Sequence, residues 1–349
     1  MKITSASIVQ FTPRFSPSRG GVETHVGMVC RELVACGATP LVITVAEDAA
    51  APEYEQVDGV QIIRMPASYK NNKYRTWHWI WRHRHLCIGP EKIFHIHDVG
   101  WWVVPLLPYC IKQFFITFHG WEGVYPVPLM NKLQRLFFAT LAKKTIHIGA
   151  YIQQFYFDKP SVVLYGGTDV TSAVTEKINS ATDLAIVFVG RLEKENDLAA
   201  YCALLDELKK RKRAVTIRWC GGGAYRKKCE EYGPVLGMVD EKKILAEIER
   251  ADFVCAASYL SILTAQAVGK VVCALYSQPL KEAYLQTYPG SSTMIVSSDV
   301  TKAADQLIEL TQHSEKKRAL EVQSQQYARA QSWQALTDVY CDLWNNKVQ

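Results

Sequence analysis

Short apolar runs alternate with longer amphipathic stretches along the whole chain. In the amino-terminal half the apolar runs predict five strands, at residues 5–9, 40–45, 60–65, 93–97 and 114–118. An amphipathic stretch at 22–36, followed by Gly37, predicts a helix between the first two strands. Strands that alternate with helices are typical of a doubly wound α/β domain built on a parallel sheet.

The carboxy-terminal half repeats this alternation. Further strands are predicted at 184–189, 215–220, 253–257 and 271–275, and helices at 198–211, 241–251 and 263–268. A segment rich in Thr, Ser and small residues separates the halves and is typical of a hinge. We expect four segments: a first domain at 1–165, a hinge at 166–182, a second domain at 183–313 and a carboxy-terminal helix within 314–349.

Composition and charge narrow the class of protein. A length of 349 residues suits two domains. The chain contains no run of about 18 apolar residues, so no membrane-spanning helix is predicted. The first residues lack an apolar core followed by a small-residue cleavage site, so we expect a cytoplasmic protein. Residues 1–165 hold 17 Lys and Arg against 11 Asp and Glu, which equals the whole net charge of +6. This half should therefore attract anionic surfaces.

The ten cysteines are scattered, and no two form a Cys-x-x-Cys pair. Metal sites built from cysteines usually use such closely spaced pairs, and disulfide frameworks are typical of short secreted chains. The cysteines are therefore predicted to be buried thiols, and no metal site is expected from them.

A Gly20-Gly21 turn lies between the first predicted strand and the first helix. Free amides beside a helix amino terminus can bind an anion. The turn matches neither the G-x-G-x-x-G fingerprint nor the phosphate-binding loop with its lysine. Taken alone, a tight turn that needs glycine explains it equally well.

Six segments, in order along residues 8 to 275, resemble motifs of the family 4 glycosyltransferases with the GT-B fold. Arg19–His25 resembles their GG-x-E opening, and Thr117–Glu122 resembles their T-x-H-G loop. The other four are similar to the family's interdomain, phosphate, glycine and nucleobase loops: Val163–Asp169, Phe188–Glu193, Gly221–Gly223 and Leu236–Val239. The resemblance implies an α/β fold of two Rossmann-like, doubly wound domains that face a cleft, with a carboxy-terminal helix that crosses back to the first domain.

The resemblance also implies a reaction. A hexose would pass from a UDP- or GDP-sugar, held by the second domain, to a hydroxyl of a lipid-linked or polysaccharide acceptor, with retention of configuration. Arg191 and Lys194 would balance the diphosphate charge, so no metal or other cofactor is expected. His119 would lie against the transferred sugar, and Asp98 would face the acceptor. The implied donor-binding positions are Gly20, Gly21, Arg191, Lys194, Gly221, Gly223, Met238, Val239, and the helix-opening amides of Ile262, Leu263 and Thr264.

Two positions depart from the family pattern. Asn196 stands where the family usually has a lysine, and Thr264 stands where the second glutamate of its E-x7-E motif belongs. The contracted segment Ser258–Thr264 has no room for the first glutamate. A lost charged hydrogen bond costs about 1.5–3 kcal/mol, which weakens a donor site without abolishing it.

These departures leave two other functions open. One is a catalytically inactive GT-B-like subunit that binds a sugar, a lipid or a partner enzyme. The other is a different enzyme on the same fold, such as a sugar-nucleotide epimerase, with Asp98 and Glu122 as its carboxylate pair.

Residues 70–85 combine three tryptophans, at alternate positions 77, 79 and 81, with five Lys and Arg. Three interpretations stay open: a packed helix with solvated charges, an anionic membrane or lipid acceptor, and stacking on nucleic acid. The period of two does not suit an interfacial helix, so packing is favoured, membrane binding comes second and nucleic acid last.

Overall fold

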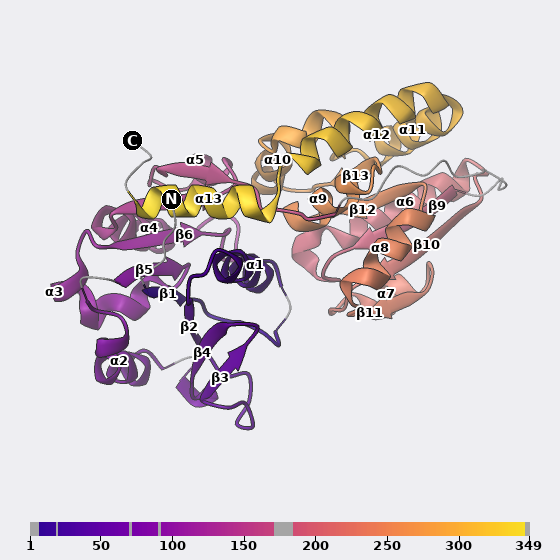
Figure 1. Cartoon of the computed structure of the whole chain (residues 1–349). Helices are drawn as coiled ribbons and strands as arrows, with labels where there is room; N and C mark the ends of the chain where they lie inside the picture. Colours follow the sequence, from indigo (N-terminus) through magenta and orange to yellow (C-terminus); the bar gives the residue numbers. More distant parts are fainter. Residues whose placement is uncertain (1–6, 19, 70–71, 90–91, 171–183, 346–349) are drawn as a thin grey trace. The chain divides into compact units, whose positions relative to one another are not determined.

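The chain divides into two compact units (Figure 1). A computed structural model describes residues 7–18, 20–69, 72–89, 92–170 and 184–345. Unit 1 comprises residues 1–164 and 333–349, and unit 2 comprises residues 165–332. Of the expected hinge at 166–182, residues 171–182 lie outside the described part of the chain.

Unit 1 is built on an eight-stranded sheet with the order β3-β4-β2-β1-β5-β6-β7-β8, parallel except for the β3-β4 pair. Its strands are β1 (Ser7–Phe11), β2 (Leu41–Val45), β3 (Tyr54–Val57), β4 (Val60–Met65), β5 (Lys92–His97), β6 (Phe114–Phe118), β7 (Lys144–Ile148) and β8 (Val162–Leu164). Its helices are α1 (Gly21–Ala35), α2 (Lys73–Arg82), α3 (Leu107–Cys110), α4 (Leu129–Leu141), α5 (Ile152–Phe155) and α13 (Trp333–Trp344). The strand order reverses between β1 and β5, where doubly wound sheets bind ligands.

Unit 2 has a six-stranded parallel sheet with the order β11-β10-β9-β12-β13-β14. Its strands are β9 (Leu184–Val189), β10 (Val215–Cys220), β11 (Val235–Gly237), β12 (Phe253–Ala256), β13 (Val272–Leu275) and β14 (Ile295–Ser297). Its helices are α6 (Leu198–Lys210), α7 (Arg226–Glu230), α8 (Glu241–Arg250), α9 (Tyr259–Ala267), α10 (Pro279–Gln286), α11 (Val300–Gln312) and α12 (Ser314–Arg329). The doubly wound α/β architecture predicted for both halves is confirmed.

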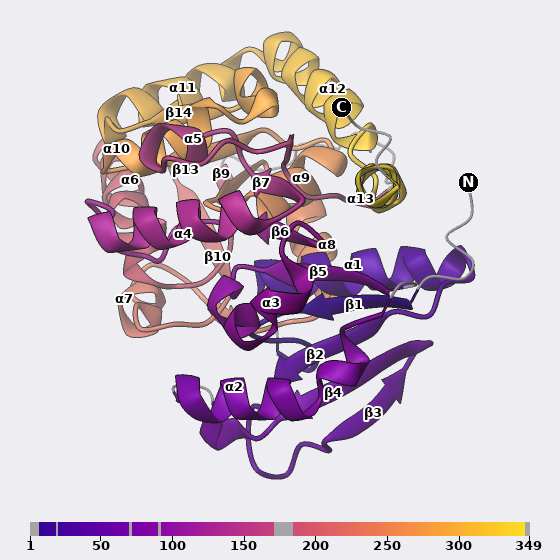
Figure 2. The same cartoon turned by 90° about the vertical axis from the view of Figure 1, so that its left-hand side faces the viewer.

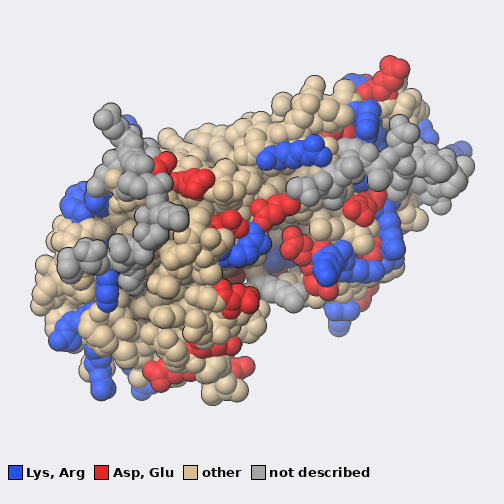
Figure 3. Space-filling model, viewed as in Figure 1, with Lys and Arg blue, Asp and Glu red and all other residues tan. Residues whose placement is uncertain are grey.

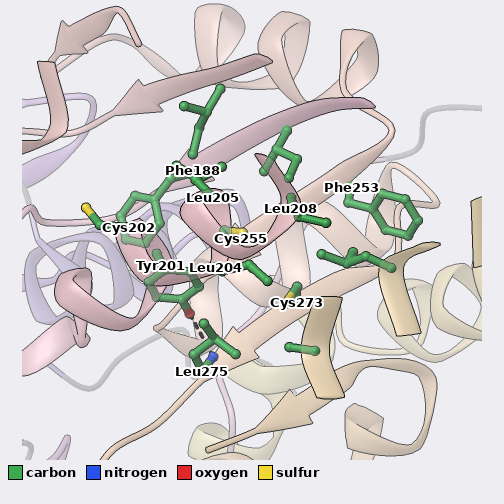
Figure 4. Close-up of a cluster of buried hydrophobic side chains, with 14 of the residues drawn as sticks. Phe188, Tyr201, Cys202, Leu204, Leu205, Leu208, Phe253, Cys255, Cys273 and Leu275 are labelled. Carbon is green, nitrogen blue, oxygen red and sulfur yellow. Dashed lines mark hydrogen bonds between the residues drawn. The ribbon is translucent and has the colours of Figure 1, made fainter. Parts of the chain in front are cut away.

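The core of unit 2 lies between its sheet and helix α6 (Figure 4). The buried Tyr201 of α6 accepts a hydrogen bond from Leu275 N at 3.0 Å and donates one to Ala256 O at 3.3 Å. Its hydroxyl therefore ties α6 to the carboxyl ends of β12 and β13. All ten cysteines are free thiols, and eight of them are buried.

The segment expected to form one carboxy-terminal helix forms two, α12 and α13, because the chain turns at residues 330–332. Helix α12 packs against α9 in unit 2, and α13 packs against α1 in unit 1. Only the second helix therefore returns to the first unit. No helix among the described residues is both long and apolar enough to span a bilayer.

The tryptophan-rich segment forms α2, and residues 70–71 of it lie outside the described part. Trp79 is buried and stacks on His83, with 3.9 Å between ring centroids. Trp77 Nε1 donates to the Trp101 carbonyl at 2.7 Å. Packing therefore accounts for Trp77 and Trp79, whereas the Trp81 side chain is 38% exposed.

Candidate functional site

A network of four histidines lies toward the carboxyl ends of β1, β5 and β6 in unit 1. His97, the last residue of β5, is bonded through Nδ1 to His119 Nε2 and through Nε2 to Gln10 Oε1, both at 2.8 Å. The ring of His25, from α1, lies 4.8 Å from the ring of His119.

Helix α13 completes this network. The Tyr340 hydroxyl lies 2.9 Å from His25 Nε2 and 3.0 Å from Thr117 Oγ1, which is 2.8 Å from His95 Nε2. Trp344 Nε1 donates to His95 Nδ1 at 3.0 Å. Among the described residues, no cluster of three or more His, Cys, Asp or Glu is arranged to hold a metal ion.

Burial keeps these histidines uncharged. Loss of hydration is the largest cause, and it lowers the pKa of His25, His95 and His97 well below 6.5. The same effect, aided by the nearby Arg135 guanidinium, lowers the pKa of His119 to about 3. At neutral pH the network therefore offers hydrogen bonds and no positive charge.

The two predicted catalytic residues contact each other directly. Asp98 follows β5 in the left-handed region, with φ of 62°, and its Oδ1 accepts a hydrogen bond from His119 N at 2.9 Å. Solvent reaches the Asp98 side chain, yet the surrounding protein reduces its hydration and raises its pKa to about 6, against the effect of Arg135. Glu122 is held separately, by the Tyr156 hydroxyl at 2.6 Å.

The predicted glycine turn lies beside this network. Gly20 caps α1 and Gly21 begins it, one turn before His25, while Arg19 lies outside the described residues. A Cβ at Gly21 would meet no atom within 4 Å, whereas at Gly20 it would lie 2.4 Å from Glu23 Oε2. Space is therefore open at Gly21, and the Glu23 carboxylate lies over Gly20.

In unit 2, the loops after β9, β10 and β11 pack together. Gly190 N donates to Cys220 O at 3.0 Å, and Leu192 N donates to Gly222 O at 2.8 Å. The residue after β10, Gly221, also bridges to Gly237 at the end of β11. The three loops predicted to bind the donor thus form one rim at the carboxyl edge of the sheet, where open α/β sheets bind ligands.

Close backbone approach explains the glycines of this rim. A Cβ at Gly221 would lie 1.8 Å from Gly190 O, and one at Gly223 would lie 2.4 Å from Leu192 O. Both residues also have a positive φ, of 155° and 151°. Any side chain at these positions would push the two loops apart.

The charged side chains of the rim are accessible. The Arg191 side chain is 64% exposed, and its NH2 lies 3.2 Å from Glu195 Oε1. Lys194, in the short 3-10 helix η4 (Lys194–Asn196), and Met238 are also exposed, and Val239 follows Met238 in the chain. Asn196 donates to the Arg191 carbonyl at 2.8 Å, so it braces this loop without adding charge.

The prediction that Ile262, Leu263 and Thr264 open a helix toward a diphosphate is wrong. Helix α9 begins at Tyr259, and Ile262 N already donates to Ser258 O at 2.9 Å. Ile262 and Leu263 are fully buried, and the Thr264 hydroxyl donates to the Leu260 carbonyl at 2.8 Å. All three residues lie inside the helix, because α9 is capped by Ser258 and begins at Tyr259, one turn earlier than the apolar pattern indicates.

Lys281 of α10 is a buried cation that the sequence did not single out. Its Nζ donates to the carbonyl of Ala257, just before α9, and lies 4.4 Å from the Tyr284 ring centroid. Burial lowers its pKa to about 8, an effect that Asp197 opposes and Arg191 strengthens. In the sequence a lysine beside Glu282 looks like part of a solvated helix face.

Acid should destabilise the chain as the pH falls below 6.5. The unfolded chain then binds protons that the buried neutral histidines do not, at a cost of about 2 kcal/mol per histidine at pH 5. Urea denaturation between pH 7.5 and 5 measures this loss. His95→Gln should reduce it, with the exposed His78→Gln as control. Equal stability at both pH values would contradict the neutral network.

Alanine at Gly221 should destabilise unit 2 by about 2–4 kcal/mol, because it strains the backbone and separates two loops. The control is Gly222→Ala, whose Cβ would lie 3.6 Å from Met238 Cγ in ordinary contact. Thermal and urea unfolding compare the two variants. Equal losses in both would show that the loop approach does not require glycine at 221.

Lys281→Met should reduce the dependence of the free energy of unfolding on pH between pH 8 and 10.5. The unfolded lysine holds its proton up to about pH 10.5 while the folded one releases it near 8. Wild-type stability should therefore rise between pH 8 and 10.5 relative to the variant, by up to about 3 kcal/mol. Urea denaturation across this range is the measurement, with the exposed Lys302→Met as control. Parallel profiles would mean that the ammonium is not buried.

Comparison with known proteins finds similarity to glycosyltransferases. Residues 19–171 match the family model Glycosyltransferase Family 4. A search of curated proteins finds no match.

Solved structures match over almost the whole chain. Sucrose-phosphate synthase from Thermosynechococcus elongatus has a TM-score of 0.79 at 16% identity, covering 98% of both chains. HepE from Anabaena, in complex with UDP-glucose, has a TM-score of 0.69 at 15% identity over 97% of this chain and 99% of its own. WaaG, involved in lipopolysaccharide biosynthesis, scores 0.67 at 12% identity over 96% and 99%. The chain therefore has the two-domain fold of these glycosyltransferase structures, and its residues 19–171 match the Glycosyltransferase Family 4 model.

Proposed function

We propose that the chain is a retaining glycosyltransferase that moves a hexose from a UDP- or GDP-sugar to a hydroxyl of a lipid-linked or polysaccharide acceptor. The observation that carries the proposal is the rim of unit 2, where the exposed Arg191 side chain stands on loops locked by the glycines at 221 and 223. A guanidinium on a rigid loop suits a diphosphate, because it donates two parallel charge-assisted hydrogen bonds. HepE, which shares the fold, was solved with UDP-glucose.

In this proposal the leaving diphosphate is stabilised by side chains of unit 2. Arg191 and Lys194 supply charge at the rim, and Lys281 supplies a further cation beneath it. A bound phosphate would raise the pKa of Lys281 and so hold its proton in place. Charge that develops on the leaving group is then met by groups already in position.

Unit 1 contributes His119 and Asp98. His97 fixes the neutral His119 ring, which is suited to bond a sugar hydroxyl without adding charge. The Asp98 carboxylate, with a pKa of about 6, is mostly ionised at pH 7.5 and can accept a proton from an acceptor hydroxyl. Gly21 leaves room for the substrate at the start of α1.

A catalytically inactive binding subunit is the second candidate, and the two departing positions favour it. The Thr264 hydroxyl is used inside its own helix, and the Asn196 amide is used on the Arg191 carbonyl. Neither replaces the charge of the family residue. The distinction is measurable, since an inactive subunit binds a nucleotide sugar without hydrolysing or transferring it.

Calorimetry with UDP-, GDP- and ADP-sugars should find micromolar binding of one donor. Arg191→Ala should weaken that binding about 10- to 150-fold, because one charged hydrogen-bonding group is lost. Arg318→Ala, on the exposed side of α12, is the matched control. If no nucleotide sugar bound a folded sample below millimolar concentration, the transferase proposal would fall.

A further inference from the structure

Helix α4 of unit 1 turns its apolar face to solvent. Four of its large apolar side chains are between 46% and 71% exposed: Leu129, Met130, Leu133 and Phe137. At 100° per residue these positions fall within one arc of about 100°. The buried side of the helix carries Arg135 and Phe138 instead. We call the four exposed residues the α4 face.

Other exposed apolar side chains lie in the segments next to α4. Val124 and Tyr125 precede the helix, and Phe157 follows α5. Of the fifteen exposed large hydrophobic side chains among the described residues, seven lie between residues 124 and 157. A concentration of this kind marks an interaction surface, because scattered single residues are the normal case.

The charged side chains of α4 and its neighbouring segments are positive. Residues 123–157 hold four Lys and Arg and no Asp or Glu, and of these four only Arg135 is buried. Lys132 Nζ lies 5.5 Å from the centroid of the Phe157 ring, so a cation borders the apolar residues. A surface of apolar side chains bordered by cations fits a lipid bilayer with anionic headgroups, because the bilayer can accept both kinds of side chain.

Helices α2 and α3 extend this side of unit 1. The 3-10 helix η3 (Gly100–Leu106) leads into α3 and supports α4, since a Cβ at Gly100 would lie 2.6 Å from the Phe138 ring. The rings of Trp81 in α2 and Tyr109 in α3, both partly exposed, lie 6.0 Å apart. Figure 2 shows α2, α3 and α4 on the side toward the viewer, and Figure 3 shows Lys and Arg along the corresponding left-hand margin.

We propose that unit 1 docks on an anionic lipid surface through the α4 face, with the cations of α2 and the α4 region at the lipid phosphates. The contact thus centres on α4, and residues 73–85 of the segment singled out in the sequence form its border. This inference rests on the proposed function in one respect: docking would bring the transferase to an acceptor held in a membrane. The docking itself requires no nucleotide sugar.

Vesicle flotation with the full chain tests the proposal. The wild type should float with vesicles that contain phosphatidylglycerol, less with pure phosphatidylcholine, and less in high salt. The double variant Met130→Asp with Phe137→Asp should reduce the bound fraction about tenfold or more on anionic vesicles, because it places charge on the apolar face. Both positions are exposed, so the fold should persist, and circular dichroism checks this.

The matched control is Val322→Asp, an exposed apolar residue of α12 in unit 2, which should float as the wild type does. Donor binding by calorimetry should be equal in all three proteins, which separates failed docking from failed donor binding. The proposal is overturned if the wild type does not float with anionic vesicles, or if the double variant floats equally well. It is also overturned if sedimentation shows a wild-type dimer that the double variant lacks, since a second copy would then cover the α4 face.

Discussion

The site of unit 1 depends on keeping four imidazole rings uncharged inside the protein. Each ring is bonded to another polar group or packed on a neighbouring ring, and two of the essential partners, Tyr340 and Trp344, come from α13 at the far end of the sequence. A buried polar group without a partner is costly, so the network is stable only when α13 is in place. Helix α13 therefore supports the histidines that surround His119.

In unit 2, exposed charged side chains lie on closely packed loops at the carboxyl edge of the sheet. Its loops approach so closely that Gly221 and Gly223 leave no room for a Cβ, and Asn196 braces the backbone of Arg191. The two cations Arg191 and Lys281 differ in their exposure to solvent. Arg191 is exposed, while burial lowers the pKa of Lys281 to about 8. In the proposed function, a bound phosphate would raise the pKa of Lys281 and keep its ammonium charged.

The strands were predicted where an apolar run is long enough to stand out, as in β2 and β6, which are buried on both faces. The prediction missed five strands: β3, β7, β8, β11 and β14. Lys144 and His147 interrupt the apolar residues of β7, and three-residue strands such as β11 carry too little pattern. Each of the five is paired with a neighbouring strand in its sheet. The start of α9 was missed because its first turn contains Tyr259 and Ser261, which read as a loop.

The sequence by itself determined the alternation of strands and helices, the glycine turns and the excess of positive charge in the first half, since each is a property of neighbours along the chain. It also placed His119, Asp98 and Arg191 at strand ends. Only the tertiary structure decided that four histidines share one network, that Lys281 is buried, and that α4 exposes its apolar face. Burial and partnership are set by residues distant in the sequence, and no local pattern contains them.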